Sequence, residues 1–197
     1  MKNIFWIFAA LLGFTFVACS EDKEVGEFDG NWKERNEAYI DSIALVAKAN
    51  EGSQVGQWRV LQSYHLSTGY VSKDNQEYVF AKILRNGEGK ESPLYTDSVT
   101  VNYRGHLIPT ASYPKGLVFD QNYYGEEMNP DVMVPSGFYV DGVVEGWRTA
   151  LQYMREGDIW QLYVPQKMGY GAEGSGSSIP GYSTLIFNVY LRKVTHK

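Results

Sequence analysis

One acid, Asp120, stands beside a set of aromatic residues in the stretch from Val99 to Val194. In this stretch Tyr103, Trp147 and Phe187 fall at the right phase to line one cavity. The same stretch has no Ser/His/Asp set, no cluster of metal ligands and no glycine-rich phosphate loop. The combination points to chemistry performed by an apolar pocket rather than by a nucleophile.

Two predicted strands and one predicted helix bring these side chains together. Tyr103 lies on the apolar face of a strand with alternating residues, because every second side chain of a strand points to the same side. Phe187 lies on the apolar face of the last strand, predicted over 183–194. Trp147 lies on the apolar side of a helix predicted over 144–154. Both strand faces are therefore expected to point toward the helix.

The remaining patterns predict an α+β fold. Further strands are predicted over 78–84, 116–120 and 158–165, and a helix over 32–50. The segment 57–66 fits either a short strand or a helix. Strands outnumber helices, so we expect an antiparallel β-sheet wrapped around a short helix, with an N-terminal helical extension. The apolar residues of the extension that we expect to pack on the main domain are Tyr39 or Ile40, Ile43, Val46 and Ala47.

The first residues follow the pattern of a signal peptide. Lys2 precedes an apolar run that ends at Ala18 and is too short for a stable membrane span. The residues before Cys19 resemble a bacterial lipobox, after which the cysteine is lipidated and becomes the N-terminus. The alternative is an ordinary secretory signal followed by an unused cysteine. Lipidation would hold the mature chain at a membrane surface.

Four segments follow from these patterns. They are a signal peptide at 1–18, an acidic tether at 19–30, a helical extension at 31–77 and the main domain at 78–197. The acidic residues at 20–24 fit a solvated tether. They also resemble the sorting signal that sends some lipoproteins of Bacteroides-like bacteria to the outer face of the outer membrane. We therefore expect a cell-envelope protein, lipid-anchored to the outer membrane, on its periplasmic or its outer side.

The composition argues against several kinds of partner and site. The chain has 23 acidic and 18 basic residues and a net charge of −5, whereas nucleic acid favours a basic face. A single cysteine allows no internal disulfide, and three scattered histidines beside it argue against a zinc site. No metal, cofactor or nucleic acid is expected.

Several motifs in fixed order resemble those of the FKBP-type peptidyl-prolyl cis-trans isomerases. They are VTVNYRG with Tyr103, VFD with Phe119 and Asp120, GVVEGW with Val143, Val144 and Trp147, GYG with Tyr170, and Ile179-Pro180 followed by Phe187. The resemblance runs from about residue 78 to the C-terminus. It implies the family's sheet-on-helix fold and the isomerisation of X–Pro peptide bonds, assisting the folding of envelope proteins.

The resemblance also implies roles for these residues. The substrate-binding set that it implies is Tyr103, Phe119, Val143, Trp147, Ile179 and Phe187. The catalytic set is Asp120, Tyr170 and Val144: the Val144 N–H and the Tyr170 hydroxyl would hold carbonyls that flank the proline. Asp120 either orients Tyr103 or polarises the site, and the alternative is a purely structural Asp120 that is hydrogen-bonded to the sheet. The implied partners are proline-containing polypeptides and macrolide-type inhibitors of the family.

One wall of the implied pocket cannot be assigned from the sequence. The family places a phenylalanine between the Phe-Asp pair and the tryptophan, and Val134, Phe138 and Tyr139 are the residues available there. This divergence leaves room for a binding or chaperone module with little isomerase activity. A lipoprotein that docks a partner through the helix at 32–50 is a further alternative.

A hydrolase is the least favoured alternative. It would have to use Asp120 with Glu145 or Glu173, and nothing in the sequence pairs these acids.

Overall fold

The computed structural model describes residues 26–66, 69–125, 128–129 and 132–197. The predicted signal peptide, Cys19 and the first part of the acidic tether lie outside the described residues. Within the described part, no helix combines the length and apolar character that a bilayer span requires.

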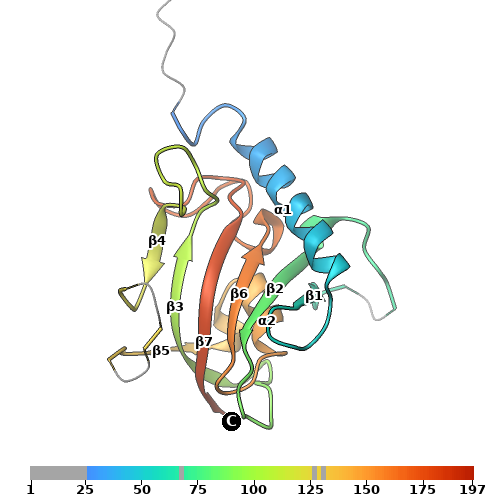
Figure 1. The fold of residues 1–197 in the computed structure, drawn as a ribbon, viewed down its shortest axis with the longest axis vertical. Helices are drawn as coiled ribbons and strands as arrows, with labels where there is room; N and C mark the ends of the chain where they lie inside the picture. The colour runs from blue at the N-terminus through green and yellow to red at the C-terminus, as the bar shows by residue number, and fades with distance from the viewer. Residues whose placement is uncertain (1–25, 67–68, 126–127, 130–131) are drawn as a thin grey trace, which may run out of the picture.

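Strands make up most of the regular structure. In chain order the elements are α1 (Trp32–Ala49), β1 (Trp58–Gln62), η1 (Asn75–Glu77), β2 (Tyr78–Arg85), β3 (Ser98–His106), β4 (Val118–Gln121), β5 (Ser136–Tyr139), η2 (Val140–Gly142), α2 (Glu145–Leu151), β6 (Ile159–Val164), η3 (Gln166–Met168) and β7 (Leu185–Thr195). The expected α+β class and the expected helical extension are both confirmed (Figure 1).

All strand pairs of the sheet are antiparallel, and the strand order is β1-β2-β6-β7-β3-β4. The short strand β5 also pairs with β3. β4 lies opposite residues 104–106 of β3, and β5 lies opposite residues 98–101. The two strands therefore follow one another along the same edge of β3. Between these two stretches β3 presents Tyr103.

The two helices pack on opposite faces of the sheet. Consecutive residues of a strand point to opposite sides. On β6, the ring of Tyr163 lies 6.3 Å from that of Tyr39 on α1. The next residue, Val164, faces Gly146 on α2. The sheet is thus covered by α1 on one side and by α2 on the other (Figure 1).

Helix α1 is fixed to the segment before β7 by buried polar contacts. The Trp32 indole donates to the hydroxyl of Ser183 at 3.1 Å. The Asn36 side-chain oxygen accepts the N–H of Thr184 at 2.7 Å. The buried face of α1 is Trp32, Asn36, Ile40, Ala44 and Ala47. The expectation for Val46 was wrong, because this face follows steps of four residues from Trp32 to Ala44 and then three to Ala47, which leaves Val46 54% exposed.

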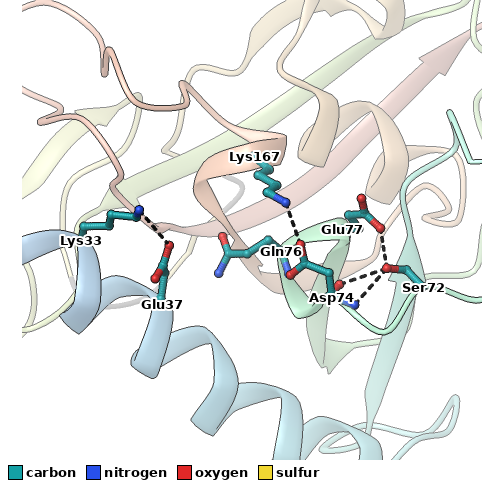
Figure 2. Close-up of polar contacts among 7 residues, drawn as sticks. All are labelled: Lys33, Glu37, Ser72, Asp74, Gln76, Glu77 and Lys167. Carbon is teal, nitrogen blue, oxygen red and sulfur yellow. Dashed lines mark hydrogen bonds and ion pairs between the residues drawn. The ribbon is translucent and has the colours of Figure 1, made fainter.

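The uncertain segment 57–66 contributes a strand. Its residues 58–62 form β1 and pair with residues 78–82 of β2, so the extension adds an edge strand to the main sheet. Of two ion pairs on this side, one joins distant parts of the chain and the other lies within α1. Lys167 of η3 reaches Asp74, just before η1, at 2.7 Å, while Lys33 and Glu37 pair along α1 at 4.0 Å (Figure 2).

Helix α2 lies so close to the sheet that one of its positions must be glycine. A Cβ built on Gly146 would stand 2.3 Å from Cγ1 of Val164 and 3.1 Å from its Cβ. The latter atom is fixed to the backbone of β6 and cannot turn away. The absence of a side chain at Gly146 therefore sets how closely Trp147, the next residue, approaches the sheet.

We expect Gly146→Ala to lower the free energy of unfolding by about 1–3 kcal/mol, because the methyl group must push α2 away from β6. Gly137→Ala on β5 is the matched control, since a Cβ there meets nothing within 4 Å. Urea unfolding of both variants measures the difference. Equal stability of the two variants would contradict the close approach.

Candidate active site

A cavity of about 300 Å³ lies between α2 and β3, at the edge of β3 with which β4 and β5 both pair. Its lining residues are Tyr103, Asp120, Phe138, Gly142, Val143, Val144, Trp147, Tyr170 and Phe187. Most of this lining is apolar or aromatic. Small-molecule and peptide sites are typically concave and apolar with a few placed polar groups, so this cavity is the candidate site.

A larger hollow of about 550 Å³ lies beyond the C-terminal end of α2. Its lining is mostly polar and includes Arg59, Gln152 and Asp158. It holds none of the side chains that the sequence motifs single out. The smaller, aromatic cavity therefore stays the candidate site.

Three aromatic rings meet the indole of Trp147 edge to face. The centroid distances are 5.2 Å to Tyr103, 5.2 Å to Phe187 and 5.8 Å to Phe138. The interplanar angles lie between 73° and 90°. Edge-to-face contacts are the favoured geometry for aromatic pairs, so the rings hold one another in place. Trp147 is 4% exposed and forms the floor of the cavity.

The wall behind Phe187 depends on a glycine in β3. Gly105 lies opposite Phe187 of β7 and opposite Asp120 of β4. A Cβ on Gly105 would stand 2.5 Å from the ring of Phe119 and 2.7 Å from the ring of Phe187. These two rings pack edge to face at 5.4 Å. Phe119 thus supports Phe187 and is not itself among the lining residues.

The acid of the site is bonded to the tyrosine beside it. The hydroxyl of Tyr103 donates to Oδ2 of Asp120 at 2.7 Å. Burial, together with this hydrogen bond, raises the pKa of the Tyr103 hydroxyl well above its ordinary value. Tyr103 therefore stays protonated and remains a donor, and Asp120 fixes its orientation. Of the contacts expected for Asp120, the structure shows the hydrogen bond with Tyr103.

Two further polar groups lie at the rim. Val144 caps the start of α2 with extended backbone angles, φ −57° and ψ 151°. Its carbonyl accepts the N–H of Arg148 at 3.0 Å. Among the described residues, no acceptor binds the N–H of Val144. Tyr170 lines the cavity and is 41% exposed.

The sequence-predicted site residues converge only in part. The cavity brings together seven of them, which are Tyr103, Asp120, Val143, Val144, Trp147, Tyr170 and Phe187. Phe119 and Ile179 are absent from the lining. Ile179 is buried in the loop before β7, where it exchanges backbone hydrogen bonds with Ser175. The roles expected for all nine residues, Phe119 and Ile179 included, stay predictions.

The structure also resolves the unassigned wall. Of the three residues available for this wall, Phe138 lines the cavity, and its ring centroid lies 5.8 Å from that of Tyr103. Val134 and Tyr139 are 79% and 57% exposed. The register of β5 explains this choice, because Phe138 lies opposite Val99, whose face of β3 also carries Tyr103. Gly142 is a lining residue that sequence reasoning missed.

Comparison with known proteins gives one family. The model of the FKBP-type peptidyl-prolyl cis-trans isomerases matches residues 89–192. The macrophage infectivity potentiator of Trypanosoma cruzi is 40% identical over 182 residues, which cover 92% of this chain and 79% of that protein. The FKBP-type 22 kDa peptidyl-prolyl cis-trans isomerase of Escherichia coli (strain K12) is 40% identical over 113 residues, or 57% of this chain. The match covers 48% of that protein, so the chain spans about half its length.

A solved structure shares the fold. The peptidyl-prolyl cis-trans isomerase of Pseudomonas syringae pv. tomato superposes with a TM-score of 0.56 and 27% sequence identity. The superposition covers 83% of this chain and 96% of that one. It therefore includes part of the N-terminal extension as well as the residues that match the family model.

The contact between Tyr103 and Asp120 can be measured by a double-mutant cycle of Tyr103→Phe and Asp120→Ala. We expect a coupling energy of about 1–2 kcal/mol in the free energy of unfolding, because the hydrogen bond has a charged acceptor. The control is the neutral bond from Tyr163 to Gln161, 2.7 Å long in the same sheet, with an expected coupling of about 0.5–1 kcal/mol. A coupling near zero for the first pair would remove Asp120 from its positioning role.

Proposed function

The chain belongs to the FKBP-type peptidyl-prolyl cis-trans isomerase family, and from this premise we propose that it catalyses the cis–trans isomerisation of X–Pro peptide bonds in the cavity above Trp147. Residues 78–197 form the catalytic unit in this proposal. The substrates are proline-containing segments of other polypeptides, and macrolide-type compounds that inhibit the family are expected to occupy the same cavity.

The required chemistry is modest and fits the residues present. Rotation about an X–Pro bond crosses a barrier of about 20 kcal/mol and takes tens of seconds unaided. An acceleration of roughly 10⁴-fold corresponds to about 5.5 kcal/mol of transition-state stabilisation. No covalent bond breaks, so neither a nucleophile nor a metal is needed. Differential binding of the twisted amide is sufficient.

An apolar cavity can supply part of this stabilisation. The twisted amide loses resonance, so its carbonyl is less polar than that of the planar form. Water-poor surroundings therefore favour the twisted form over the planar one. In the proposal the proline ring rests on the indole of Trp147, between the rings of Tyr103 and Phe187. The edge-to-face packing keeps these rings from closing over the space that the proline needs.

Polar groups at the rim hold the peptide that flanks the proline. The N–H of Val144 is the donor to one flanking carbonyl, and the Tyr170 hydroxyl is the donor to another. Each such bond contributes on the order of 1 kcal/mol. The observation that carries the proposal is the position of Val144, which lines an aromatic cavity and whose N–H meets no acceptor among the residues that the structure describes. Phe119 supports the ring of Phe187 from behind. Ile179 is proposed to contact the peptide when it is bound.

We expect Trp147→Leu to lower kcat/KM on an Ala-Leu-Pro-Phe-type peptide by at least roughly tenfold, since a floor of different shape no longer matches the twisted amide. Trp160→Leu is the matched control. Trp160 is equally buried, and its indole N–H, like that of Trp147, has no partner in the described part of the chain, but it lies outside the cavity. A protease-coupled assay measures both variants.

The wild-type chain provides the decisive result. Acceleration of the peptide at micromolar enzyme supports the isomerase. Peptide binding without acceleration would instead favour a binding or chaperone module, and equal activity of the two tryptophan variants would show that the cavity is not the site.

We also propose that the protein is a lipoprotein of the bacterial envelope, anchored through Cys19. The signal pattern before Cys19 supports this, and so does the name of a relative from Legionella longbeachae, "Outer membrane protein MIP", which is 36% identical over 113 residues. Placement at the outer membrane, of the kind found in Bacteroides-like bacteria, extends the same proposal. The acidic residues at 20–24 support a solvated tether between lipid and domain.

We expect Cys19→Ser to abolish incorporation of labelled palmitate into the chain and to move the protein from the membrane fraction to the soluble fraction, because the acyl chains supply the membrane affinity. Ser20→Ala, one residue later, is the control and should keep both the label and the location. Membrane association of Cys19→Ser equal to that of the control would contradict the anchor.

A further inference from the structure

The peptide group between Val143 and Val144 has a partner besides the substrate carbonyl proposed for its N–H, and the family resemblance does not assign it. Arg148 of α2 directs Nη2 to the carbonyl oxygen of Val143 at 2.8 Å. That oxygen and the N–H of Val144 belong to one planar peptide group. The atom that Arg148 holds is therefore rigidly connected to the N–H of Val144, a residue that lines the cavity.

The same guanidinium is held from the other side by the N-terminal extension. Its Nη1 donates to the hydroxyl of Tyr64 at 2.6 Å. Its central carbon lies 5.6 Å from the ring centroid of Tyr64 and 5.6 Å from that of Tyr95. In the described part of the chain, no carboxylate pairs with Arg148 within 4.0 Å. The fork of the guanidinium and its flat faces account for all these contacts, and an ammonium group could not make them together.

Ser63 and His65, the neighbours of Tyr64, contact the same turn of α2. Ser63 donates a hydrogen bond to the carboxylate of Glu145, the first residue of the helix. His65 approaches the other oxygen of that carboxylate at 3.8 Å. Residues 63–65 thus contact α2 at two points, through Glu145 and through Arg148. They precede the residues 89–192 that match the family model.

We propose that Arg148 is a positioning residue of the isomerase, and that Tyr64 of the N-terminal extension holds it in place. Arg148 fixes the direction of the Val143–Val144 peptide group and polarises it. A donor at the carbonyl oxygen strengthens the hydrogen bond that the N–H of the same group gives, because successive hydrogen bonds polarise one another. Substrate bound to Val144 completes a chain from Tyr64 through Arg148 and the peptide group. The inference rests on the proposed function, which supplies the substrate carbonyl.

The test compares Arg148→Ala, Arg148→Lys and Tyr64→Phe in the full chain. We expect Arg148→Ala to lower kcat/KM on the Ala-Leu-Pro-Phe-type peptide by about tenfold, since a charge-assisted bond to the rim peptide is lost. Arg148→Lys and Tyr64→Phe should each lower it by about threefold, because one of the two linked bonds remains. In all three variants the loss of kcat/KM should appear without a comparable change in melting temperature.

Arg85→Ala is the matched control. Arg85 also donates to a backbone carbonyl, that of Gly157 at 2.9 Å, and also packs on a tyrosine ring, that of Tyr190 at 4.5 Å. Arg85 is not among the residues that line the cavity, so kcat/KM of Arg85→Ala should stay within about twofold of wild type.

A spectroscopic readout separates positioning from general stability. The amide nitrogen frequency of Val144 responds to hydrogen bonding at the carbonyl of its own peptide group. It should shift in Arg148→Ala and by less in Tyr64→Phe, and it should not shift in Arg85→Ala. Wild-type kinetics and an unmoved Val144 amide in Arg148→Ala would overturn the inference.

Failure of the proposed function gives a different pattern. A wild-type chain without isomerase activity removes that function, and the Val144 amide then decides the inference alone. If Arg148→Ala does not fold, Arg148→Lys and Tyr64→Phe decide it through the same two readouts.

Discussion

The contact between α2 and β6 at Gly146 is the constraint on which the site depends. Val164 leaves no room for a Cβ at that position, so the helix lies directly on the sheet. Trp147 follows Gly146 and is pressed among the rings of β3, β5 and β7, while Val144 stands one turn earlier at the rim. If α2 lay farther from the sheet, both Trp147 at the floor and the N–H of Val144 would move away from the aromatic walls of the cavity.

The N-terminal extension has a larger part in this arrangement than its place in the sequence suggests. β1 completes one edge of the sheet, and α1 covers the face opposite α2. Residues 63–65 then leave β1 and reach the first turn of α2. The extension therefore covers one face of the sheet and contacts, on the other side, the first turn of the helix that carries Trp147. The predicted boundary at residue 78 falls between β1 and β2, which pair with one another.

Much of the fold follows from local patterns in the sequence. Alternation predicts β3 and β7, and helical spacing predicts α1 and places Trp147 on the inner side of α2. To predict that Phe138, and neither of the other two candidates, lines the cavity wall requires the register of β5 against β3, which no local pattern encodes. The contact of Arg148 with Tyr64 joins residues 84 positions apart, and neither residue belongs to a family motif. Long-range polar contacts of this kind become visible only in three dimensions.

The central claim is that the cavity above Trp147 binds a proline and lowers the cost of twisting its amide. Exchange spectroscopy on an Ala-Leu-Pro-Phe-type peptide with a substoichiometric amount of the full chain tests it directly. We predict exchange cross-peaks between the cis and trans forms at mixing times far below the tens of seconds of the free peptide, with contacts between proline ring protons and the Trp147 indole. Exchange at the rate of the free peptide, with no such contacts, would contradict the account.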